Sequence, residues 1–170
     1  MGSDNDEYSA MTKEVNAGKY QWTVIAHKGF IGWQSLDTKD LIDFSLSVDA
    51  RESQNPNIGE YGLIFREDRD GNFYYFGITR NREFFIRVNY KDNWEDLIAP
   101  TYSESIRPVV FNRLTIVGQG SHFLFFINNR YVAEVTDGRI STGAIGIAVG
   151  LSRTDDKSVF EFDNIELNAP

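Results

Sequence analysis

The chain has 170 residues, 41% hydrophobic and 25% charged, a composition typical of a soluble globule that buries one core. Its formal net charge of −8 at pH 7 opposes binding to nucleic acid or to an anionic membrane surface, because both are negatively charged. The absence of cysteine excludes disulfides, thiolate metal sites and thiol nucleophiles. No apolar run is long enough to span a bilayer, so we expect no membrane insertion.

The first sixteen residues open with Met-Gly-Ser and are polar and acidic, without hydrophobic periodicity. We expect residues 1–16 to be a flexible N-terminal segment that includes an expression-tag remnant, and residues 17–170 to form a single domain. The segment has neither the basic start nor the apolar core of a secretion signal. If the tag replaces native sequence, the export signal of a larger protein was removed with it.

Short runs rich in β-branched and aromatic residues follow one another along the rest of the chain. A strand is expected at 20–27, a glycine-rich loop at 28–33, and an alternating, half-exposed strand at 41–51. Residues 61–80 contain two strands around Asp70-Gly71, a dipeptide that supplies the positive φ of a tight hairpin. Further strands are expected at 83–90, 94–99, 112–118, 123–128, 131–135, 142–150 and 158–167.

The spacing of these elements predicts an all-β fold. No stretch of a dozen residues has a sustained helical period, so little or no helix is expected. About 10 to 13 short strands suit a two-sheet antiparallel β-sandwich, with a closed barrel as the alternative. Segments such as 84–86 and 123–127 are apolar on both faces. We therefore expect a loop, a sheet edge, a ligand or a protein partner to cover the outer face of one sheet.

Five segments together resemble the concanavalin A-like lectin/glucanase superfamily, a jelly-roll fold: YGLIFR, NFYYFGI, NRLTIVGQG followed by FLFFINNRYVAEVTD, STGAIGIAVG and FEFDNIEL. The likeness covers residues 18–167. It is greatest to uncharacterised bacterial modules related to 3-keto-disaccharide hydrolase and to laminin-G-like domains. Because the superfamily contains lectins, carbohydrate-binding modules, glycosidases and adhesion domains, the resemblance implies a fold and leaves the function to the site.

The last strand contains Glu161, Asp163 and Glu166, in the pattern Glu-x-Asp-x-x-Glu. This resembles the catalytic strand of family 16 glycoside hydrolases, in which alternate carboxylates act as nucleophile, helper and general acid. In those enzymes the motif lies in the middle of the chain, whereas here it lies at the end. The alternative is a structural strand with solvated acids, and we assign no catalytic residue.

The resemblance also implies a calcium site. Many jelly-roll members hold one calcium ion with an aspartate of the last strand and backbone carbonyls, which makes Asp163 the candidate ligand. No other cofactor is expected.

Strand alternation predicts a ligand-binding face. If Leu63, Phe76 and Ile86 point inward, then Arg66, Tyr75, Arg87 and Asn89 point outward. Rings and forked donors suit a sugar, although a cross-strand ladder without any ligand would use the same residues. Among the tryptophans, which more often anchor cores and loops, Trp94 beside a turn is the one expected to be exposed, and it is the fifth candidate ligand-binding residue.

The sequence thus predicts a non-catalytic module that binds carbohydrate or a cell-surface glycan and works outside the cell as part of a larger exported protein. A glycoside hydrolase using the last strand is one alternative. A structural domain that binds another protein is the other.

Overall fold

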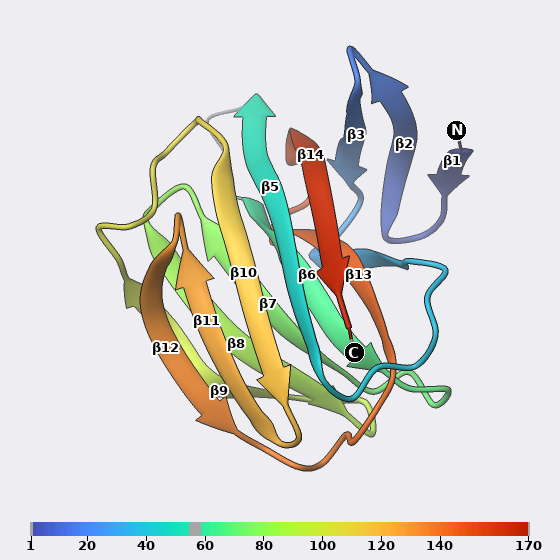
Figure 1. Ribbon diagram of the computed structural model, residues 1–170. Coiled ribbons are helices and arrows are strands. Elements are labelled where there is room, and N and C mark those ends of the chain that lie inside the picture. The colour runs from blue at the N-terminus through green and yellow to red at the C-terminus, as the bar shows by residue number, and fades with distance from the viewer. Residues whose placement is uncertain (1, 55–58, 170) are drawn as a thin grey trace.

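The computed structural model describes residues 2–54 and 59–169. Within them the chain forms fourteen strands and no helix, arranged as two antiparallel sheets packed face to face (Figure 1). In spatial order, the eight-stranded sheet contains β1 (Gly2–Asn5), β2 (Ser9–Asn16), β3 (Lys19–Ala26), β14 (Lys157–Asn168), β5 (Phe44–Gln54), β10 (Asn112–Gln119), β11 (His122–Ile127) and β12 (Arg130–Thr136). The six-stranded sheet contains β4 (Phe30–Ser35), β13 (Ala144–Leu151), β6 (Gly59–Glu67), β7 (Phe73–Thr79), β8 (Glu83–Tyr90) and β9 (Asn93–Tyr102). The predicted β-sandwich is confirmed.

The core lies between the two sheets and is built from alternate residues of their strands. In the eight-stranded sheet, β5 pairs with β10 so that Val48 lies opposite Leu114 and Leu46 opposite Ile116, all fully buried. From the six-stranded sheet, Phe65 packs its ring 5.0 Å from that of Phe123. This regular alternation is why the sequence predicts the inward faces of these strands.

The hairpin of β6 and β7 closes through the turn at Asp68–Asn72, as expected. The backbone N–H groups of Asp70 and Asn72 donate to Asp68 Oδ1 at 2.9 and 3.0 Å. Gly71 has φ 78°, a conformation that glycine adopts without the strain a Cβ would bring. The Asp68 carboxylate therefore stabilises the turn by accepting hydrogen bonds from the turn's own backbone.

The N-terminus departs from prediction. β2 pairs with β3 over its whole length, and β1 pairs with β2. Ser9 is buried and Met11 packs against the core, so tertiary contacts order a segment whose composition is polar. The prediction that regular structure starts only after residue 16 is wrong.

A second departure is β4, where a loop was expected at residues 28–33. Phe30–Ser35 pairs with β13 and forms one edge of the six-stranded sheet. A Cβ on Gly32 would lie 2.9 Å from the Met11 side chain, so this glycine serves close packing rather than a loop. No helix in the described part of the chain is long and apolar enough to cross a membrane.

Candidate functional site

The outer face of the six-stranded sheet carries a second apolar cluster, separate from the core. It consists of Ile64, Phe73, Tyr75, Phe85 and Ala148, each at most 1% exposed, with Ile31 packed against them. An outer sheet face normally meets water. Here the chain itself covers it, which confirms the prediction that one outer face is covered.

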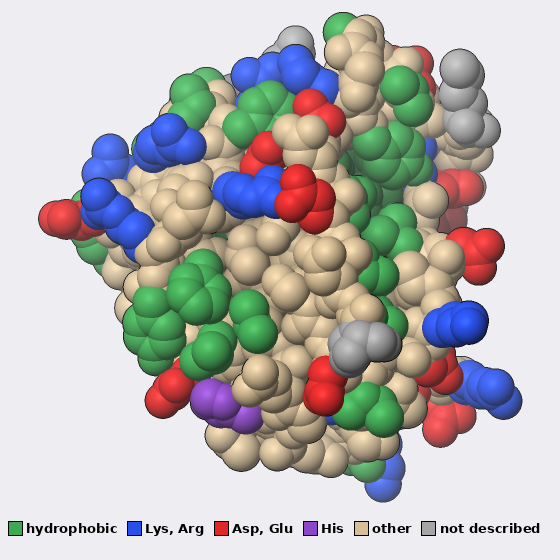
Figure 2. Space-filling model, in the orientation of Figure 1, with side chains coloured by type: hydrophobic (Ala, Val, Ile, Leu, Met, Phe, Trp, Pro, Cys, Tyr) green, Lys and Arg blue, Asp and Glu red, His purple; other side chains and the backbone are tan. Residues whose placement is uncertain are grey.

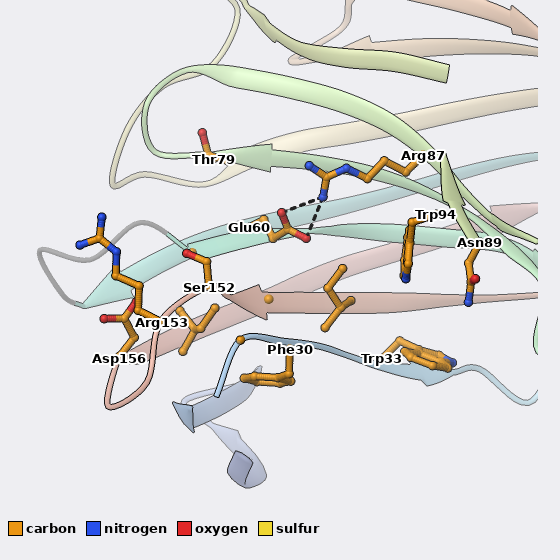
Figure 3. Close-up of a pocket in the computed structure, with 15 residues that line it drawn as sticks. Phe30, Trp33, Glu60, Thr79, Arg87, Asn89, Trp94, Ser152, Arg153 and Asp156 are labelled. Atoms are coloured by element: carbon orange, nitrogen blue, oxygen red, sulfur yellow. Dashed lines mark hydrogen bonds and ion pairs between the residues drawn. The ribbon is translucent and has the colours of Figure 1, made fainter. Parts of the chain in front are cut away.

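A cavity of about 820 Å³ lies on this face, a volume typical of small-ligand sites. Its lining comes from β4, β6, β7, β8, β9, β13 and the connection from β13 to β14. Figure 3 shows two tryptophans at one end, an arginine and a glutamate in the middle, and Ser152, Arg153 and Asp156 at the other end.

The aromatic end is formed by Trp33 on β4 and Trp94 on β9, strands at opposite edges of the sheet. Both rings pack on the buried Phe73 of β7, at centroid distances of 4.8 Å and 5.5 Å. Trp33 Nε1 donates to Glu67 Oε1 at 2.8 Å, which fixes its ring. The side chains remain 38% and 44% exposed, so the two rings can contact a ligand.

The polar centre is an ion pair between Arg87 on β8 and Glu60 on β6. Arg87 Nη1 donates to Glu60 Oε2 at 3.0 Å and Nε donates to Asp96 Oδ1 at 2.8 Å, while the guanidinium stacks 3.9 Å from the Phe85 ring. A Cβ on Gly150 would lie 2.8 Å from the Glu60 side chain, so the glycine leaves room for it. Burial raises the pKa of Glu60, and the charge of Arg87 opposes that shift.

Two lining residues carry buried polar atoms without a hydrogen-bond partner among the described residues. These atoms are Thr79 Oγ1 and Asn89 Oδ1. The hydroxyl of Tyr75, in the apolar cluster beneath, is likewise unpaired, and burial holds its pKa well above the usual range. Both atoms are inaccessible to solvent, so they offer no hydrogen bond to a ligand in the cavity as it stands.

Three of the five residues expected to bind ligand, Arg87, Asn89 and Trp94, line this cavity. Tyr75 lies on the same face as predicted, yet it is fully buried and packs its ring against Phe85 at 5.1 Å. It supports the floor without lining the cavity.

Arg66 lies elsewhere, and its predicted place on this face is wrong. Phe65 and Glu67 pair with successive residues of β13, so Arg66 is the extra residue of a bulge and has φ 55°. Its guanidinium turns inward and stacks 4.8 Å from the Phe123 ring. It donates to the backbone carbonyls of Ile42, Gly120 and Ile140.

Sequence reasoning missed Trp33, Glu60 and Thr79. Trp33 falls in the segment expected to be a loop, and Glu60 lies one residue before the expected hairpin. Alternation does contain a signal, because Glu60, Gly62 and Ile64 are alternate residues of one strand and share a face.

The acids of the last strand lie on the other side of the sandwich. Phe160 and Phe162 of β14 face the core, so Glu161 and Asp163 face outward from the eight-stranded sheet. Arg51 forms an ion pair with Glu161, and Arg113 Nη2 contacts Glu166 Oε2 at 2.6 Å. Glu161, Asp163 and Glu166 do not line the cavity on the six-stranded sheet. Each glutamate is neutralised by an arginine, an arrangement that favours a structural role.

The side chains around Asp163 take part in hydrogen bonds and ion pairs within the sheet. Asp163 Oδ1 accepts a hydrogen bond from the backbone N–H of Asn164 at 2.8 Å. Asp49 lies opposite Asp163 on the neighbouring strand, and Arg113 forms an ion pair with Asp49 at 3.2 Å. The arginine charge repels a divalent cation. Among the residues described, no group of three His, Asp or Glu side chains could hold a metal ion. Calcium binding stays a prediction, which a melting temperature raised by calcium and restored by chelator would test.

An aromatic patch lies on the same outer face. Tyr131 is 55% exposed and its ring packs 6.0 Å from that of Phe126, beside Leu124. Figure 2 shows hydrophobic side chains gathered over β11 and β12. The predicted protein partner would be sought on this patch.

No family model matches the chain, and no curated protein matches its sequence. Its structure is similar to the carbohydrate-binding module CBM66 from Bacillus subtilis, with a TM-score of 0.67 and 17% identity over 94% of this chain and 92% of that one. It is also similar to the laminarinase catalytic domain of Thermotoga petrophila, with a TM-score of 0.62 and 7% identity over 96% of this chain and 80% of that one. A third similar structure is sheep galectin-11 in complex with glycerol, with a TM-score of 0.55 and 11% identity over 83% of this chain and 98% of that one. At these identities the similarity establishes the fold alone. The chain therefore shares the two-sheet jelly-roll fold of these structures.

Proposed function

We propose that this protein is a non-catalytic carbohydrate-binding module and that the cavity on the six-stranded sheet is its binding site. The observation that carries the proposal is the pair Trp33 and Trp94, which stand partly exposed on one buried phenylalanine beside the Arg87–Glu60 pair.

The chemistry of these groups suits a sugar. The C–H faces of a pyranose or furanose ring are apolar and pack on aromatic rings, while its hydroxyls need both donors and acceptors. In the cavity, Glu60 supplies acceptors and Arg87 supplies donors. An apolar ligand would cover the Arg87–Glu60 pair without forming hydrogen bonds to it, and the rings would contribute little to binding a small ion.

The similar structures agree with this choice, since one is named a carbohydrate-binding module and another a galectin. We expect such a module to act outside the cell within a larger exported protein, on polysaccharide or cell-surface glycan. The ion-paired acids of β14 give the glycosidase alternative no support. Retained glycosidase activity in a Glu161→Gln variant would exclude that strand as its source.

The test is a glycan array followed by calorimetric titration of the oligosaccharides that bind. Trp33→Ala and Trp94→Ala should each weaken binding about tenfold, because loss of a stacked ring costs about 1.5 kcal/mol. Tyr131→Ala is the matched control, since it removes an exposed aromatic ring on the opposite sheet. Equal loss in all three variants, or no loss in either tryptophan variant, would contradict the proposal.

A further inference from the structure

The charges that line the cavity are few and mostly neutralised. Four charged residues contribute, two acidic and two basic: Glu60, Asp156, Arg87 and Arg153. Arg153 and Asp156 lie at the end away from the tryptophans (Figure 3). Beside the rings, the charged groups of the lining are therefore Arg87 and Glu60.

The charge of Arg87 is already committed to two carboxylates. Glu60 accepts a hydrogen bond from Arg87 Nη1, and Asp96 accepts one from Arg87 Nε. The guanidinium plane packs on the Phe85 ring. A ligand carboxylate would compete with both acids for this cation. It would also bring a second negative charge next to Glu60, a side chain that is 21% exposed and whose ionised form burial already disfavours.

The hydrogen-bond inventory points the same way. The two carboxylate oxygens of Glu60 are acceptors when the side chain is ionised. Sugar hydroxyls supply the donors that these atoms need. A carboxylate or sulfate group has acceptors alone and would leave them unsatisfied.

We propose that the cavity selects neutral sugars over carboxylated or sulfated ones, and that Glu60 is the residue that sets this selection. This inference rests on the proposed function, because it concerns the ligand of the same site. Glu60 acts in two ways: it accepts hydroxyl donors from a neutral ring, and it repels an acidic ring while occupying the arginine that would otherwise bind it.

The experiment titrates matched pairs of oligosaccharides, glucose against glucuronate oligomers, galactose against galacturonate oligomers, and lactose against sulfated lactose, at about 150 mM NaCl. In each pair that binds, the neutral member should bind at least about tenfold more tightly. Its affinity should change less than about twofold on raising the salt, since no net charge is paired in binding.

The deciding variant is Glu60→Gln, which keeps the side-chain size and leaves Arg87 paired with Asp96 alone. It should tighten binding of the acidic members and reduce the neutral-to-acidic ratio at least about threefold, whatever its effect on neutral binding. Glu166→Gln is the matched control, because it breaks a glutamate–arginine pair on the other sheet and should leave the ratio unchanged. Thermal unfolding confirms that both variants are folded.

Three results are distinguishable. Equal or tighter binding of acidic sugars to the wild type, lost in the tryptophan variants, overturns the selection and leaves the binding site intact. An unchanged ratio in Glu60→Gln overturns the role of Glu60. Absence of binding to any sugar, neutral or acidic, overturns the proposed function and this inference together.

Discussion

Replacing Arg66 with methionine tests whether this arginine stabilises the fold rather than binding ligand. Arg66 is 1% exposed, and its guanidinium donates to three backbone carbonyls and stacks on Phe123. Methionine retains the aliphatic stem and removes every donor. Of the three carbonyl residues, Ile42 and Gly120 are exposed and can be hydrated, whereas Ile140 is 3% exposed and would lose its donor.

The expected cost follows from these contacts. An unsatisfied buried acceptor costs about 1 to 3 kcal/mol. Loss of the cation–π contact adds about 0.5 to 2 kcal/mol, and release of a buried charge offsets part of the sum. We expect a net destabilisation of about 2 to 4 kcal/mol, which lowers Tm by about 4 to 16 °C in a domain of this size.

Urea and thermal unfolding, followed by circular dichroism, measure this change. Arg69→Met is the control, because Arg69 is exposed in the adjacent turn and its loss should cost no more than about 0.5 kcal/mol. A free energy of unfolding for Arg66→Met within about 0.5 kcal/mol of the wild type would refute the reasoning. So would loss of sugar binding by the folded variant, since Arg66 lies outside the cavity.

Two further substitutions test the interior. Glu52 accepts a hydrogen bond from Ser158 Oγ at 2.6 Å, and burial raises its pKa above the value in the unfolded chain. The folded state therefore favours the protonated carboxyl, and this contribution to stability is lost as pH rises through the folded-state pKa. The Tm of Glu52→Gln relative to the wild type should therefore rise from about pH 4 to about pH 8, and a falling difference would contradict this. A Cβ on Gly62 would lie 2.0 Å from the Phe76 carbonyl oxygen, so Gly62→Ala should cost about 2 to 4 kcal/mol in urea unfolding. Gly138→Ala, with its nearest contact at 3.7 Å, should be neutral, and equal stability of the two variants would contradict the packing argument.

Local sequence pattern predicts the sheets well because the period of a strand is fixed at two residues. Leu63, Phe76 and Ile86 were expected to point inward, and each is buried in the core. The same rule predicts the outward face of Arg87 and Asn89, which line the cavity. Polar composition at the N-terminus gave no such pattern, so β1 and β2 were missed.

The remaining features of the site depend on geometry that is not local. Arg66 leaves its expected face because one bulge inserts a residue, and a non-glycine residue with positive φ leaves no mark in the sequence. Trp33 and Trp94 are far apart in the chain and on opposite sheet edges, yet both rest on Phe73. Alternation assigns each residue to a face, and it does not reveal which distant residues meet there.

The central claim is that a neutral sugar binds between the exposed tryptophans of the six-stranded sheet. The indole N–H resonances of the three tryptophans test it directly, because Trp22 is fully buried in the core and serves as an internal reference. On titration with the tightest neutral oligosaccharide from the array, the resonances of Trp33 and Trp94 should shift with a common saturation curve while that of Trp22 stays fixed. A saturable shift of Trp22 alone, or binding that leaves Trp33 and Trp94 unshifted, would contradict the claim.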